Sequence, residues 1–162
     1  MKHIPTFLTG MTVWIDGVGL LGTAKTITLP KIEKNRETTT QGGFERSVDT
    51  GIFKAMECEL EFSELHSSTY KAIAKNNPTF VAKGSIKHKI VNKAVVLTVK
   101  GGIDVDDGNF ETGNEVTQKV KVFCDFYQLE IAGEKLVMLD VENMIAEING
   151  VDYLDTVRKQ IL

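Results

Sequence analysis

Alternating apolar and polar residues run through most of the chain and predict strands. The clearest segment is 56–62, where every second residue is apolar and the residues between are Glu57, Glu59 and Glu61. A period of two puts the two sets on opposite faces of a strand, one apolar and one acidic. Comparable patterns predict strands over residues 12–16, 20–29, 79–90, 94–105, 116–131 and 135–140.

Residues 116–131 form the longest predicted strand. Its apolar set is Val120, Val122, Cys124 and Phe126. The opposite face is predicted to carry Lys119, Lys121, Phe123, Asp125 and Tyr127. Because residues 132–134 are Ala-Gly-Glu, we expect a tight turn and a hairpin with 135–140.

Two helices are predicted beside these strands. The first runs over residues 64–75, with Ser63 at its N-cap and Asn-Asn-Pro at 76–78 as its end. The second follows the segment 149–152 at the end of the chain, with Asp152 at its N-cap. Asp152 and Asp155 suit the positive end of that helix dipole, and Arg158 and Lys159 suit its negative end. Its apolar stripe consists of Leu154, Val157 and Ile161.

Residues 31–51 break the pattern. The stretch 35–43 is polar, contains Gly42 and Gly43, and has no apolar periodicity. We therefore expect an extended loop, and a loop of this length in a compact domain is usually functional or disordered until it meets a partner.

These elements together predict a mainly β protein, a β-sandwich or barrel with helices at its periphery. A length of 162 residues, 42% hydrophobic and 25% charged, is typical of one globular domain. No window approaches the roughly 20 apolar residues of a spanning helix, and residues 1–10 lack the apolar core of a signal peptide. We expect a chain that is cytosolic when made and does not insert into a membrane as a monomer.

The net charge of −3 argues against nonspecific nucleic-acid affinity, which depends on basic groups that displace counterions from phosphates. Both cysteines, Cys58 and Cys124, lie within alternating strands. Buried free thiols are the favoured interpretation, and a disulfide or a reactive thiol is the alternative.

One glycine pattern resembles a dinucleotide-binding motif. Gly17, Gly19 and Gly22 follow a predicted strand with the spacing G-x-G-x-x-G. That motif needs a helix next, whereas residues 23–30 are rich in β-branched residues and end in proline. A hairpin turn is the better interpretation.

No other set of residues predicts a metal site or a catalytic site. Asp104, Asp106 and Glu115 have partial calcium-loop spacing, but Gly108 stands where a ligand is required, and no helices flank the loop. The three histidines form no metal motif, and no G-x-S-x-G elbow is present. The glutamate row at 57–61 is typical of a solvated strand face, and Trp14 is interpreted as a core or interface anchor. We predict no catalytic residue, no metal and no cofactor, so the protein is not expected to be an enzyme.

Three segments taken in order resemble the major tail tube protein of contractile-tailed phages, a family also found in R-type pyocins and related tailocins. They are residues 14–31, with Trp14-Ile-Asp-Gly17, Leu21-Gly22 and Ile27 to Lys31; residues 40–51, with Gly42-Gly43; and residues 126–152, with Leu139-Asp140, Asn143 and Ile148-Asn-Gly-Val-Asp152. The closing segment is the most specific, whereas residues 54–113 match mainly in pattern. The chain departs from the family where Phe126-Tyr127 replaces a common Tyr-Tyr pair, and it lacks the Met that often follows the glycines.

The resemblance implies a non-enzymatic tail tube domain over residues 1–162, with the extended loop at about 31–51. Subunits of this family form hexameric rings that stack into a hollow tube, with sheets joined around the lumen. The implied partners are the chain itself, the tail sheath protein, and baseplate and tail terminator proteins. DNA would pass through the lumen without specific binding. The implied location is a virion tail or tailocin particle, assembled in the bacterial host cytoplasm.

Candidate assembly residues follow from this implication. The loop residues expected to contact the next subunit or ring are Thr38, Thr39, Thr40, Gln41, Gly42 and Gly43. The residues expected to face the lumen are Glu57, Glu59, Glu61, Lys119, Lys121 and Asp125. The alternatives are the tube protein of a related non-phage contractile injection system and a small-ligand-binding β-barrel that uses the turn at 17–22.

Overall fold

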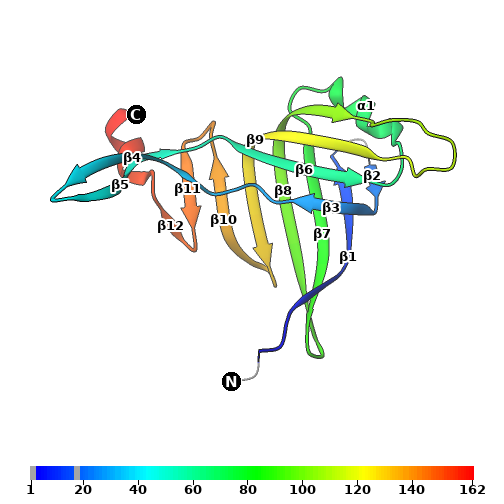
Figure 1. Ribbon diagram of the computed structural model, residues 1–162, viewed down its shortest axis with the longest axis horizontal. Coiled ribbons are helices and arrows are strands. Elements are labelled where there is room, and N and C mark those ends of the chain that lie inside the picture. The colour runs from blue at the N-terminus through cyan, green and yellow to red at the C-terminus, as the bar shows by residue number, and fades with distance from the viewer. Residues whose placement is uncertain (1–2, 17–18) are drawn as a thin grey trace.

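The computed structural model describes residues 3–16 and 19–162 and is built mainly of antiparallel strands (Figure 1). The strands are β1 (Phe7–Ile15), β2 (Gly19–Gly22), β3 (Ala24–Thr28), β4 (Lys34–Gln41), β5 (Phe44–Phe53), β6 (Met56–Phe62), β7 (Thr79–His88), β8 (Val91–Asp106), β9 (Gln118–Ile131), β10 (Glu134–Asp140), β11 (Ile145–Ile148) and β12 (Val151–Asp152). The helices are α1 (Ser67–Ile73) and α2 (Asp155–Ile161). The main sheet runs β12-β11-β10-β9-β8-β7-β1-β2, and β4 and β5 form a separate hairpin.

A bulge in β9 divides the main sheet into two layers. Pairing with β8 passes from Lys100–Phe126 directly to Gly101–Cys124, so Asp125 is the extra residue. Before this point β9 pairs with β6, and after it β9 pairs with β10. Figure 1 shows β3, β6 and the first half of β9 crossing in front of the strands of the larger layer. A bulge bends a strand, and this one lets β9 take part in both layers.

The core fills the space between these two layers. One row of the larger layer consists of six paired residues that are all buried: Ile15, Phe80, Val99, Tyr127, Leu139 and Ala146. The smaller layer contributes the buried residues Met56, Cys58, Leu60, Phe62, Val120, Val122 and Cys124. Burial of each large apolar side chain contributes about 1.5–3 kcal/mol, and this holds the crossed layers together.

The bulge also corrects the predicted faces of β9. Tyr127 was expected beside Lys119 and Lys121, yet it is 2% exposed, while Phe126 is only partly buried. The extra residue Asp125 inverts the alternation from that point on. The prediction for residues 118–124 is confirmed, because Val120, Val122 and Cys124 are buried.

Residues 31–51 are not a loop. The structure places most of this segment in the β4–β5 hairpin, which projects from one end of the molecule (Figure 1). Both of its faces are exposed along nearly its whole length. The prediction failed because apolar alternation marks a strand only when one of its faces is buried.

The first predicted helix is shorter than expected. It begins after an N-cap at His66 that makes no side-chain capping bond, so Ser63 is not the cap. The strand predicted over 20–29 is interrupted at Thr23 into β2 and β3, and the break between the strands predicted over 79–90 and 94–105 lies at Lys89 and Ile90. No helix follows Gly22, as expected for a hairpin, although Gly17 and Val18 lie outside the described residues.

Trp14 is not a core residue. Val13 and Ile15 on either side are buried, whereas Trp14 is 42% exposed on the outer face of the larger layer. The Lys83 ammonium lies over its ring at 5.7 Å from the centroid.

The end of the chain differs from its prediction in two respects. Asn149 and Gly150 have φ of 50° and 82° and form the turn between β11 and β12, so the segment expected to lead directly into the helix is a turn followed by a short strand. The N-cap of α2 is Leu154 rather than Asp152. Leu154 packs against the core, whereas Val157 and Ile161 remain largely exposed.

Candidate functional site

The candidate features in the described part of the chain are exposed surfaces and the edges of the sheet. Among residues 3–16 and 19–162, no cluster of His, Cys, Asp and Glu is arranged to hold a metal ion. Asp104 and Asp106 lie on β8, and Glu115 lies in the loop that follows. In the same described ranges, no helix is long and apolar enough to cross a membrane.

The predicted contact residues form the tip of the β4–β5 hairpin. Thr38, Thr39, Thr40 and Gln41 end β4, and all are exposed. Gly42 and Gly43 have φ of 59° and 82°, the left-handed pair that a two-residue hairpin turn requires. Phe44 directly follows this turn and is 79% exposed. The tip is therefore a projecting strand pair that carries an exposed aromatic side chain.

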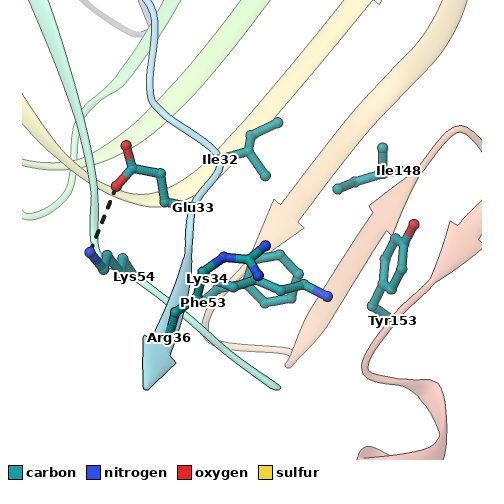
Figure 2. A pocket seen from close by; sticks show the side chains of 8 residues that line it. All are labelled: Ile32, Glu33, Lys34, Arg36, Phe53, Lys54, Ile148 and Tyr153. Carbon is teal, nitrogen blue, oxygen red and sulfur yellow. Dashed lines mark ion pairs between the residues drawn. The ribbon is translucent and has the colours of Figure 1, made fainter. Parts of the chain in front are cut away.

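The base of the hairpin is attached to the end of the chain. Lys34 lies between the rings of Phe53 and Tyr153, at 5.4 and 4.7 Å from their centroids (Figure 2). Its ammonium is also 3.0 Å from an Asp49 carboxylate oxygen. The pKa of Asp49 lies below its usual value, mainly because the backbone N–H of Gly51 donates to its carboxylate and secondly because of Lys34. A cleft of about 500 Å³ lies beside these residues, and Figure 2 shows its lining. These contacts fix where the hairpin leaves the body.

Arg158 holds α2 against the strand pair β11–β12. Its guanidinium lies 2.9 Å from Asp152 and donates to the Met144 carbonyl oxygen at 2.9 Å. Asp152 also accepts from the backbone N–H groups of Ala146 and Leu154. Partial burial raises the pKa of Asp152, but the bonds from Arg158 and the two N–H groups outweigh it and lower that pKa overall.

Five of the six predicted lumen residues lie together on the outer face of the smaller layer. Glu59 stands opposite Lys121 and Glu61 opposite Lys119 across the β6–β9 pair. Lys121 also reaches Glu57, at 3.1 Å. The sixth residue, Asp125, is the bulge residue and lies beyond this paired set.

Asp104 and Asp106 extend this charged face, and sequence reasoning did not assign them to it. They stand opposite Lys121 and Lys119 across the β8–β9 pair. Each row therefore reads Glu–Lys–Asp across three strands. We call the seven residues the charged ladder: Glu57, Glu59, Glu61, Asp104, Asp106, Lys119 and Lys121. Five carboxylates against two ammonium groups give this face a negative charge.

The smaller layer has two edges without a neighbouring strand in the described part of the chain. β3 pairs only with β6, and residues 102–106 of β8 pair only with β9. An unpaired edge presents backbone N–H and C=O groups that can pair with another strand. The layer is therefore open at both ends.

A buried polar network joins α1 to the start of β9, and no sequence-based prediction included it. The Thr69 hydroxyl donates to Gln118 at 3.0 Å, and Gln118 donates to Asp107 at 3.1 Å. The Tyr70 hydroxyl donates to the same carboxylate, which raises the pKa of Tyr70. Thr69 and Gln118 are fully buried. The available signal was period two, because Gln118 continues the buried set of Val120 and Val122.

The two cysteines are free and buried, as the sequence indicated. Burial raises the pKa of the Cys58 thiol to about 12 and that of Cys124 to about 11. Thiols react as thiolates, so burial disfavours reaction of either group near neutral pH.

The chain is similar in sequence to structural proteins of phage tails and similar in fold to a component of a contractile injection system. The family model "Phage tail tube protein FII" matches residues 5–161. The tail tube protein of Escherichia phage P2 is 29% identical over 168 aligned positions, which cover 98% of each chain. Among solved structures, the sheath/tube terminator of an extracellular contractile injection system in the extended state has a TM-score of 0.53 at 9% identity. That similarity covers 80% of this chain and 98% of the other, and it concerns the fold alone. The chain therefore belongs to the phage tail tube protein FII family, a family of structural proteins and not of enzymes.

Proposed function

We propose that this chain is a single tail tube domain that forms hexameric rings, and that the rings stack into the inner tube of a contractile tail. The observation that carries the proposal is the open smaller layer, β3-β6-β9-β8, with an unpaired edge at each end. Pairing the β3 edge of one subunit with the β8 edge of the next would satisfy both and close a barrel around a lumen.

The charged ladder is our candidate for the lumen wall. It lies on the solvent face of the same layer, so closing the ring through that layer would repeat the ladder around the bore. A surface with excess carboxylates repels phosphates, and DNA would pass without binding. Asp125 would lie at the margin of this wall.

The tip of the β4–β5 hairpin is our candidate for contact with the next ring. It projects away from both layers (Figure 1). Its base is fixed by Lys34, Phe53 and Tyr153, so the tip is presented in a defined direction.

We further propose that the tube is enclosed by a tail sheath protein and bounded by baseplate and terminator proteins. Its place would be a virion tail or a tailocin particle assembled in the host cytoplasm. The related tube of a non-phage contractile injection system is the second candidate, supported by the shared fold. A DNA-filled capsid on particles purified from the producing cells would assign the tube to a virion, and its absence would leave the tailocin and the non-phage injection system as candidates.

The hairpin register gives a sharp test. Glu37 and Val48 stand opposite each other, so replacing residues 38–47 by Asn-Gly should close a shorter hairpin without disturbing its base. We expect this variant to fold and to form no tubes in negative-stain images. A matched control keeps the length and changes only Gly42-Gly43 to Asn-Gly, and it should assemble. Normal tubes from the shortened variant would exclude the tip as an assembly contact.

A further inference from the structure

The turn between β7 and β8 forms a basic tip that carries uncovered apolar side chains. Ile90 is 92% exposed, Val91 55% and Leu8 53%, and Leu8 pairs with Ile86 beside them. Residues 79–103 contain five lysines and no aspartate or glutamate. The lysines are Lys83, Lys87, Lys89, Lys93 and Lys100. We call Leu8 and the β7–β8 residues from Ile86 to Lys93 the basic tip.

The segment after it has the opposite character. Residues 104–115 contain five carboxylates and no lysine or arginine: Asp104, Asp106, Asp107, Glu111 and Glu115. Phe110, in the middle of this segment, is 77% exposed. Residues 107–115 form most of the connection between β8 and β9, and we call them the acidic loop. Most of the Phe110 ring is therefore available for contact with another surface.

The basic tip and the acidic loop lie at opposite ends of β8. That strand spans 16 residues, on the order of 50 Å of chain at about 3.3 Å per residue. Figure 1 shows the β7–β8 turn below the larger layer and the β8–β9 loop at the upper right, beyond α1. The two surfaces are therefore far apart within one copy, so contact between them requires a neighbouring copy. Within its own copy, Asp107 accepts hydrogen bonds from Tyr70 and Gln118, and a Glu115 carboxylate oxygen lies 3.9 Å from the Lys25 ammonium.

We propose that the acidic loop of one subunit docks on the basic tip of another, with Phe110 packed against the apolar side chains of the tip. The proposal rests on the tube function above and names a subunit contact separate from the β4–β5 hairpin. Charge complementarity identifies the occupant, because lysines flank the apolar residues of one surface along the chain and carboxylates flank Phe110 in the other. A contact between two different surfaces of the same chain is heterologous, and repetition of it closes a ring or extends a stack.

The parts of this contact have different tasks. The charges lie at the rim, where they steer encounter and set register. Phe110 is the buried anchor, since aromatic residues at the centre of an interface contribute most of its affinity. Assembly should accordingly weaken as salt rises, because exposed charges are screened.

Charge reversal on each side tests the pairing. The tip variant carries Lys87→Glu, Lys89→Glu and Lys93→Glu, and the loop variant carries Glu111→Lys and Glu115→Lys. We expect each variant alone to need at least about tenfold more protein than the unaltered chain to assemble. Mixed in equal amounts, the two should assemble together, because each then offers the surface that the other requires. Phe110→Ser should weaken assembly without changing its dependence on salt.

The matched control reverses three exposed lysines elsewhere, Lys31, Lys71 and Lys135, and should assemble as the unaltered chain does. If the unaltered chain itself forms no tubes, the proposed function fails. If it forms tubes and both charge variants do so equally well, only this inference is overturned. Loss of DNA binding by the tip variant with unchanged assembly would assign the tip to nucleic acid and also overturn it.

Discussion

Gly101 occupies the place where β8 passes the extra residue of β9. A Cβ built there would collide with the Phe123 carbonyl oxygen and lie 2.8 Å from its carbon. Its neighbour Gly102 has open space at the same position. The close backbone approach explains one glycine of the pair and leaves the other free to vary.

Gly101→Ala should therefore destabilise the protein by about 2 kcal/mol or more, because backbone atoms must move to admit a methyl group. Gly102→Ala is the matched control, and it should be neutral or raise stability by about 0.4–1 kcal/mol through the unfolded state. Urea unfolding followed by circular dichroism measures both. Equal stability of the two variants would contradict the close approach.

Cys58 and Cys124 should resist thiol reagents in the folded protein. Both are buried, and burial raises the pKa of each thiol far above neutral pH. We expect no measurable reaction with a disulfide reagent at pH 8, and reaction of both thiols once urea unfolds the chain. Rapid modification of either residue before unfolding would show that the core opens there.

At the scale of elements, the strands that were predicted well are those with one buried face. β6 and the first half of β9 follow strict alternation because core and solvent lie on opposite sides. The β4–β5 hairpin was missed because it has no buried face to mark. Its weaker signals were present, since Thr38, Thr39 and Thr40 favour strands and Gly-Gly suits a tight hairpin turn.

The charged ladder shows a second limit at this scale. Alternation alone identified Glu57, Glu59 and Glu61 as one face, and Lys119 and Lys121 as another. That β6 and β9 are neighbours, and that Asp104 and Asp106 complete the rows, depends on long-range pairing. One sequence carries little information about such pairing. The bulge at Asp125 could not be predicted either, because no local sequence pattern marks an extra residue.

The anchoring of α2 depends on the ionised Asp152. Its pKa lies below the ordinary value of 3.8, so the stabilisation it contributes is present above that value and is lost as pH falls through the folded pKa. We expect Asp152→Asn to lower the urea midpoint at pH 7, and the difference from the unaltered chain to shrink as pH falls below 3.8. Glu142→Gln, an exposed change in the neighbouring turn, should have no effect at either pH. If the difference in urea midpoint between Asp152→Asn and the unaltered chain stays the same at low pH, ionisation of Asp152 does not contribute to stability.

At the scale of the whole molecule, the surfaces that stabilise the fold are separate from the surfaces available for assembly. The faces toward each other hold the apolar core, so the outer faces, the edges and the projections remain for contacts. Sequence resemblance identified the kind of assembly, whereas the local pattern alone reached only a β-sandwich or barrel. The assignment of surfaces needed the fold, because β3 and the end of β8 become edges only when the strand order is known.

The lumen assignment leads to a prediction for the assembled tube. Replacing Glu57, Glu59 and Glu61 by lysine would turn the ladder from an excess of carboxylates to an excess of ammonium groups. If this face lines the bore, tubes of the variant should retain DNA at low salt, release it as salt rises, and protect it from nuclease. Protection separates DNA held inside from DNA held outside, where the enzyme reaches it. The corresponding glutamine variant should retain less DNA, since it removes charge without reversing it.

The matched control places three lysines at Glu134, Glu142 and Glu147, which lie outside the smaller layer, and any DNA it binds should remain sensitive to nuclease. DNA on the ladder variant that is digested as fast as on this control would place the ladder on the outside of the tube and contradict the lumen assignment.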